Sequence, residues 1–499
     1  MNNKRQSNIK VVIGGLLLAI LVASMDNTIV TTALPSIVGE LGGVDKFVWV
    51  TSAYLVAQMA GMPIFGKLSD MYGRKRFFIF GLLVFMIGSV LCGTADTINE
   101  LIIYRAIQGI GGGALMPIAF TIMFDVVPLK QRGKMSGMFG AVFGISSVFG
   151  PLLGAYITEY INWTWIFYIN IPLGLIAFIM VAFFYKESLE HAEQKIDWLG
   201  AATLVGAVVC LMFAVELGGK EFAWVSPQSF GLFAGFAVLA IIFIIAERRA
   251  DEPVIDFSMF KERLFATSGL ISIFSGAAFI TASVYIPFYI QGVQGGNATN
   301  SGLVLLPMMV GSVVSASIGG ALMAKFAYRS FLIPTLALLT VGMILLATLS
   351  IDTSRFLVVF FMILAGLGIG ASFSVLPSAA IHPFSVRKRG AATSTVSFLR
   401  TFGMTIGITI FGIIQSHAFT RNMTENFGAG AASFTGDSRA LLSAEGRANI
   451  PAELSAQLTD ALSSSIASTF LWAIVPAVLA LIVAFMMSKE KLGDQIVKN

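Results

Sequence analysis

Charge is what this sequence has least of. Only 12% of its 499 residues are Asp, Glu, Lys or Arg, whereas about 25% is usual in a soluble domain. So little polar side chain cannot cover a water-facing surface, which excludes an ordinary soluble protein. The sequence also lacks the G-x-x-x-x-G-K-[ST] loop that holds nucleotide phosphates, which argues against ATP-driven chemistry by this chain.

Cysteine and histidine are also scarce. Cys92 and Cys210 both lie in apolar runs with no disulfide framework or metal-ligand spacing, so they are expected to be small apolar packing residues. His191, His382 and His417 fall in loops or at helix ends, where nothing suggests catalysis. We therefore expect no metal, no cofactor and no enzymatic activity.

Apolar residues, in contrast, make up 56% of the chain. A membrane-spanning helix needs roughly 20 mostly apolar residues. Runs of this kind predict an all-α membrane protein with fourteen spans, at 11–33, 47–66, 77–95, 99–123, 135–158, 164–185, 198–217, 229–246, 265–290, 301–324, 331–350, 356–380, 391–416 and 467–487. The first run lacks a small-residue cleavage site, so it is interpreted as a retained span and not as a signal peptide.

The loops support an even number of spans. With both termini cytoplasmic, 24 of the 32 Lys and Arg fall in inner loops or tails, as the positive-inside rule requires. The net charge of +5 is spread over short turns without a basic face, so no nucleic-acid partner is expected. The polar stretch 418–465 is predicted to be an extracellular loop, and its part at 440–463 is either an amphipathic surface helix or a plain tether.

A faint internal repeat suggests how the spans are grouped. Gly109-x-Gly111-x-Gly113 in the fourth span matches a G-x-G-x-G at 366–370 in the twelfth. Repeated halves around a midplane site are common in secondary transporters. The predicted units are therefore a six-helix bundle at 1–185, two inserted helices at 186–263 and a second six-helix bundle at 264–499.

Asp26 is the most informative residue of the first span. Burying an ionised carboxylate there costs about 2.5–3.5 kcal/mol, so desolvation favours the neutral form and the group could bind and release a proton. A structural, hydrogen-bonded Asp is the alternative. On an ideal helix Ser24, Asn27, Thr28 and Thr31 share a face nearly opposite Asp26, and the sequence leaves open which side faces a cavity.

Two arginines lie within spans. Arg105 cannot lose its charge and needs an acceptor, and Gln108 lies on its side of the helix; snorkelling to the surface is the alternative. Arg400 in the thirteenth span is either a cavity residue of the second half or the partner of a carboxylate elsewhere. Glu216 ends the seventh span, where an outer interface position is expected and a cavity position is the alternative. Gln108, Arg400 and Glu216 are the candidate cavity residues.

Two glycine-containing motifs stand out. GKLSDMYGRKR at 66–76 places Asp70 beside Arg74 at the end of a span, between two turn-forming glycines. In the fifth span, small residues and a proline permit close helix contact and a bend, at Gly144, Gly150, Pro151 and Gly154.

The 66–76 string closely resembles the signature loop of the major facilitator superfamily. Other strings resemble its fourteen-span drug:proton antiporter branch, among them MDNTIVTTALP at 25–35, YRAIQGIGGGA at 104–114, GISSVFGPLLGAYI at 144–157 and FLRTFGMTIG at 398–407. Two departures are Thr164, where the family commonly has Arg, and the second-half loop GALMAKFAYR at 320–329, which has lost its Asp and second Gly.

The resemblance implies a major facilitator fold of 6+2+6 helices. It implies that Asp26 and Arg105 couple protons, and that Asp70, Arg74 and Asp125 form a cytoplasmic gate. It also implies that the fifth-span motif marks an exporter.

The expected function is proton-coupled antiport of amphipathic, often cationic, drugs or toxic compounds by a monomer in a bacterial cell membrane. Export or flipping of one metabolite or lipid is the alternative within transport. A membrane sensor or scaffold is the alternative outside it.

Overall fold

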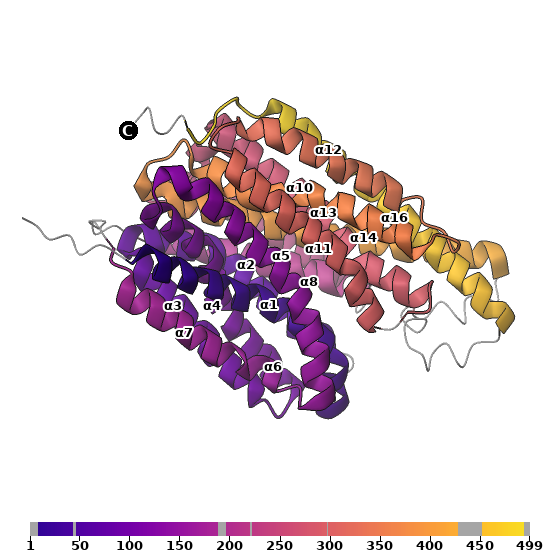
Figure 1. Cartoon of the computed structure of the whole chain (residues 1–499). Coiled ribbons are helices and arrows are strands. Elements are labelled where there is room, and N and C mark those ends of the chain that lie inside the picture. The colour runs from indigo at the N-terminus through magenta and orange to yellow at the C-terminus, as the bar shows by residue number, and fades with distance from the viewer. Residues whose placement is uncertain are drawn as a thin grey trace, which may run out of the picture.

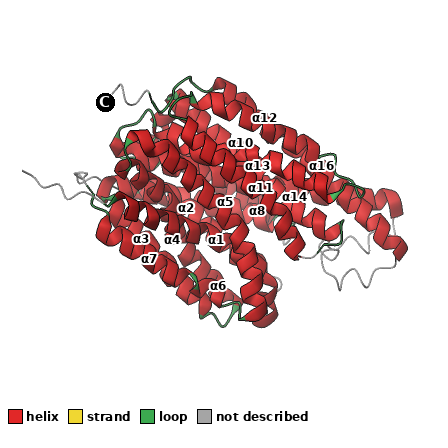
Figure 2. Ribbon diagram, viewed as in Figure 1, coloured by secondary structure: helices red, strands yellow, loops and turns green. Residues whose placement is uncertain are grey.

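The computed structural model describes residues 8–42, 46–187, 196–219, 222–296, 298–427 and 452–493. Within these ranges the regular structure is helical, apart from one isolated bridge between Gly218 and Phe222 (Figure 2). The first seven α-helices are α1 (Ile9–Leu41), α2 (Phe47–Tyr72), α3 (Arg74–Gly93), α4 (Ile98–Val126), α5 (Leu129–Tyr160), α6 (Trp165–Tyr168) and α7 (Asn170–Phe184).

The remaining described α-helices are α8 (Trp198–Leu217), α9 (Pro227–Arg249), α10 (Arg263–Gly292), α11 (Ala298–Leu322), α12 (Tyr328–Leu346), α13 (Arg355–Ile381), α14 (Arg389–Phe427) and α16 (Ala452–Met486). Two short 3-10 helices, η1 (Phe257–Lys261) and η2 (Val386–Lys388), precede α10 and α14.

Each of the fourteen predicted spans falls on a helix, with α6 and α7 together forming the sixth. By length and composition, thirteen segments of the described chain could cross a membrane. The exception is α2, which carries Thr51, Gln58, Lys67 and Asp70 among its apolar residues. Since α2 packs against α4, α8 and α14, protein replaces lipid around many of its polar groups.

The predicted loop at 418–465 is wrong at both ends. α14 continues to Phe427, and α16 already begins at Ala452; residues 428–451 of the predicted loop lie outside the described residues. The two extensions remain helical because they pack against each other: Met423 and Leu462 are buried, and Gln415 Nε2 donates to Ser465 Oγ at 3.1 Å. The described part of the possible surface helix at 440–463 therefore belongs to α16.

Most helix contacts lie within one half of the chain or the other (Figure 1). In the first half α1 packs on α5 and α7, and α4 packs on α2 and α3. In the second half α13 packs on α11 and α12, and α10 packs on α14 and α16. The inserted helices α8 and α9 pack on each other, and α8 also contacts α2. The division at 1–185, 186–263 and 264–499 stays a prediction about units that move together.

The two halves meet mainly where α5 contacts α11 and α13, and where α2 and α4 contact α14. At this seam Ser136 Oγ lies 3.0 Å from Ser378 Oγ, and Thr121 Oγ1 lies 2.8 Å from Thr393 Oγ1. These contacts lie toward one end of the molecule, which we call the basic end because Lys67, Arg74, Arg76, Arg387 and Arg389 all lie there. Away from the basic end the ribbons of the two halves diverge (Figure 1).

Candidate functional site

Asp26 lies inside the first half and not on its surface. Its side chain is fully buried, and so is that of Arg105 on α4. Arg105 Nη1 donates to Asp26 Oδ2 at 2.5 Å, which makes an ion pair between α1 and α4. The sequence predicted both residues, and the structure brings them together.

Amide groups complete the surroundings of this carboxylate. Asp26 Oδ1 accepts from Gln108 Nε2 at 2.8 Å and from Asn170 Nδ2 at 2.9 Å. Ser89 Oγ accepts from both amides, at 3.2 Å and 3.0 Å, and donates to the Phe167 carbonyl at 2.8 Å. The carboxyl group thus has hydrogen-bond donors on both of its oxygens, so neither oxygen is buried without a partner.

Arg105 is held by more than Asp26. Its Nη1 also donates to Gln108 Oε1 at 2.7 Å, its Nε donates to the Val50 carbonyl at 3.1 Å, and its guanidinium lies 4.2 Å from the Tyr54 ring centroid. Within the described chain Nη2 has no hydrogen-bond partner. Snorkelling is therefore not how this charge is accommodated. Removing one member of a buried pair typically costs about 3–5 kcal/mol.

The structure answers which side of α1 faces which neighbour. Asp26 points toward α4 and α7, whereas Thr28 lies against α5, where its Oγ1 is 1.9 Å from the place a Cβ on Gly150 would take. Thr31, on the same face as Thr28, is exposed. Asn170 was missed by the sequence reasoning, although an amide inside an apolar run could have drawn attention to it.

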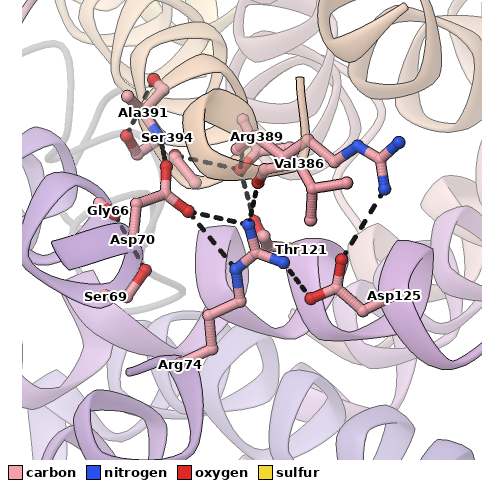
Figure 3. Close-up of polar contacts among 12 residues, drawn as sticks. Gly66, Ser69, Asp70, Arg74, Thr121, Asp125, Val386, Arg389, Ala391 and Ser394 are labelled. Atoms are coloured by element: carbon pink, nitrogen blue, oxygen red, sulfur yellow. Dashed lines mark hydrogen bonds and ion pairs between the residues drawn. The ribbon is translucent and has the colours of Figure 1, made fainter. Parts of the chain in front are cut away.

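A second charged cluster lies at the basic end (Figure 3). Arg74 Nη2 donates to Asp70 Oδ1 at 2.8 Å, its Nε donates to the same oxygen at 3.3 Å, and its Nη1 donates to Asp125 Oδ2. Arg74 is fully buried, and the side chains of Asp70 and Asp125 are only 4% and 14% exposed. The three predicted gate residues therefore form one cluster.

This cluster also crosses the seam between the halves. Arg74 Nη2 donates to the Val386 carbonyl, and Asp70 Oδ2 accepts from the Ala391 backbone N–H at 2.9 Å, in the first turn of α14 (Figure 3). A carboxylate at a helix N-terminus is favoured by the helix dipole. Arg389 Nη1 lies 3.7 Å from Asp125 Oδ1 and adds a charge of the second half. We call these contacts the seam cluster.

The fifth-span glycines have two different partners. A Cβ on Gly144 would lie 2.9 Å from Val313 of α11, whereas one on Gly154 would lie 2.2 Å from Thr32 Oγ1 of α1. α5 therefore approaches the other half near the basic end and its own half further along. Pro151 lies inside the helix, between Gly150 and Gly154, which both face α1.

The two remaining candidate site residues are Glu216 and Arg400. The side chain of Glu216 lies outside the described part of the chain. Arg400 on α14 donates from Nη2 to the Ser372 carbonyl at 3.1 Å and lies 4.9 Å from the Phe373 ring centroid. Among the described residues it forms no ion pair with a carboxylate, so the predicted alternative of a distant acidic partner finds no support there.

The comparisons with known proteins identify the family of this chain. The family model described as Major Facilitator Superfamily matches residues 16–408. The chain belongs to the major facilitator superfamily. This membership indicates a membrane transporter and not an enzyme, and with the apolar helices it supports a cell-membrane location.

Two relatives of this major facilitator protein come from Bacillus subtilis (strain 168). Multidrug resistance protein 3 is 53% identical over 494 residues, which cover 98% of this chain and 96% of the relative. Multidrug transporter protein MdtP is 40% identical over 412 residues, which cover 83% and 76% of the two chains.

Solved structures show the same fold at low sequence identity. The human organic anion transporter MFSD10 (TETRAN) has a TM-score of 0.64 and 15% identity, covering 97% of this chain and 100% of its own. The proton:xylose symporter XylE has a TM-score of 0.63 and 13% identity, covering 98% of each chain. The predicted major facilitator fold is confirmed.

Proposed function

We propose that this chain is a proton-coupled antiporter that exports amphipathic, often cationic, compounds by alternating access. The observation that carries the proposal is the fully buried ion pair of Asp26 and Arg105. The names of its relatives, a multidrug resistance protein and a multidrug transporter, support the export of several drugs.

Asp26 is the proton-binding group in this proposal. In the arrangement described, Arg105, Gln108 and Asn170 all donate to the carboxyl group of Asp26. A proton on Asp26 removes the charge that Arg105 neutralises and so weakens the pair that joins α1 to α4. Proton binding and the packing of these helices are therefore linked, because each state of the carboxyl group favours a different set of contacts.

In this proposal, the seam cluster controls which face of the membrane the transporter is open to. Under the positive-inside rule the basic end is cytoplasmic, and so are both termini. The described arrangement, joined at that end, then corresponds to an outward-facing state. Opening toward the cytoplasm must separate Asp70 from the start of α14 and Arg74 from η2. An inward proton supplies about 2.3 kcal/mol per 100 mV of membrane potential, in addition to the pH gradient, to drive the cycle.

The test uses purified protein in lipid vesicles with an imposed pH gradient and ethidium as the probe. Asp26→Asn removes the titrating group but keeps a similar shape. We expect it to lose gradient-driven ethidium accumulation by at least about tenfold, while ethidium exchange without a gradient continues. Asp256→Asn, a control outside the spans, should behave like the unmodified protein. Full gradient-driven accumulation by Asp26→Asn, with unchanged pH dependence, would refute the proposed role.

A further inference from the structure

Within the described part of the second half, Arg400 is a charge without a counter-ion. Between Glu262 and Glu425 the sequence contains a single carboxylate, Asp352. Asp352 is exposed in the loop between α12 and α13. The carboxylate of the first half that lies within a span, Asp26, is already occupied by Arg105 and two amides.

Arg400 lies too deep along α14 for its side chain to snorkel to the membrane surface. It lies eleven residues after Arg389, the first residue of α14, and a rise of 1.5 Å per residue places it about 16 Å along the helix. That is near the middle of a hydrocarbon layer of about 30 Å. An arginine at such a depth is costly unless it faces protein partners or a water-filled cavity.

The contacts of Arg400 leave most of its donors unused. A guanidinium has five N–H donors, and the hydrogen bond described here is the one from Nη2 to the Ser372 carbonyl. Nε and Nη1 donate to no described atom, and Arg400 is only half-buried, whereas the side chain of Arg105 is fully buried. They therefore border a space that a small polar group can enter.

The surroundings of this space are aromatic. The Phe373 ring below Arg400 packs against Phe143 of α5 at a centroid distance of 4.7 Å and against Phe279 of α10 at 5.6 Å. Phe143 belongs to the first half, so this group of rings lies at the seam between the halves. The guanidinium thus combines an unpaired positive charge with ring faces that can take a flat apolar molecule.

We propose that Arg400 is a substrate-binding residue that selects compounds carrying a carboxylate on an aromatic framework. The carboxylate is held by the free guanidinium donors, which match its two oxygens, and the aromatic part packs near Phe373 and Phe143. A zwitterion brings the missing negative charge with it, whereas a purely cationic compound does not. This inference rests on the proposed export function and narrows its substrate class.

The test compares two probes of the same shape, a zwitterionic quinolone carboxylate and its methyl ester, which lacks the negative charge. Binding to purified protein is measured by quenching of intrinsic fluorescence, and transport by gradient-driven uptake into vesicles. We expect the unmodified protein to bind the carboxylate at least about tenfold more tightly than the ester. Arg400→Gln should abolish this difference by raising the Kd for the carboxylate, leaving the Kd for the ester unchanged, and Arg400→Lys should keep part of it.

The matched control is Arg355→Gln, which removes an exposed arginine that donates to Gln294 and should preserve the preference. Equal binding of both probes by the unmodified protein, or a preference that survives Arg400→Gln, would overturn the assignment. Ethidium separates the two proposals. Ethidium transport without any carboxylate preference rejects the role of Arg400 in substrate binding but leaves the antiport function standing. Carboxylate-selective binding without transport of any probe supports Arg400 and rejects the antiport function.

Discussion

The seam cluster allows a quantitative prediction for Asp70→Asn. The Asp70 carboxylate accepts from Arg74 at 2.8 Å and 3.3 Å and from the Ala391 N–H at 2.9 Å. The amide keeps one acceptor oxygen, so the variant loses the equivalent of one hydrogen bond to a charged group, about 1.5–3 kcal/mol. Because the Ala391 bond crosses the seam, the loss should shift the equilibrium toward separated halves by roughly 10- to 100-fold.

The assay measures the distance between spin labels at two exposed positions of the basic end, Arg76 on α3 and Arg387 on η2. Both are changed to Cys in a background where Cys92 and Cys210 are Ser. In detergent or nanodiscs, Asp70→Asn should increase the population at the longer distance, because the first half separates from the start of α14.

The control is Asp256→Asn, which breaks the more exposed pair with Lys388 at 2.8 Å. Exposed pairs contribute at most about 1 kcal/mol, so the distance distribution should hardly change. If Asp70→Asn gives the same distribution as the unmodified labelled protein, the seam cluster does not hold the halves together and the reasoning is wrong.

Three further predictions concern stability. Gly150→Ala should lower the melting temperature of the detergent-solubilised protein, and adding Thr28→Ala should restore part of it, because the new Cβ would lie 1.9 Å from the Thr28 hydroxyl oxygen. Asn170→Leu should destabilise by about 1–3 kcal/mol in chemical denaturation, since it removes a buried donor from a carboxylate. Burial raises the pKa of Asp256, but hydrogen bonds from Lys388 and Ser258 outweigh it and lower that pKa below 3.8. The Asp256–Lys388 pair therefore adds less than about 1 kcal/mol to the free energy of unfolding, because it is partly exposed. This contribution is present above pH 3.8 and lost as the pH falls further. Asp256→Asn should remove this pH dependence of stability.

Much of the fold could be predicted because lipid imposes a simple rule on the sequence. Apolar runs predicted fourteen spans that all fall on helices, and isolated charges within or beside them pointed to Asp26, Arg105 and the Asp70–Arg74 pair. The ends of α14 and α16 could not be predicted in this way. Their polar extensions are helical because of contacts with each other, and hydropathy contains no information about such pairing.

The residues that Asp70 and Arg74 bind across the seam could not be predicted from the sequence for a related reason. Asp70 binds the backbone N–H of Ala391, and Arg74 binds the carbonyl of Val386. Every residue except proline carries a backbone N–H, so no side-chain pattern marks these positions. Only the structure could show that Arg400 forms no ion pair with a described carboxylate, because an acidic residue of any helix could have reached it.

The close approach of α5 to α11 affects how fast the halves can part. A Cβ on Gly133 would lie 2.1 Å from the Gly320 carbonyl oxygen, and one on Gly137 would lie 3.0 Å from that of Ala316. At these points main chain rests on main chain, so few side chains need to change rotamer before the surfaces slide apart. Friction along this line of contact should be low, which leaves the breaking of ionic contacts at one end as the slow step of the conformational cycle.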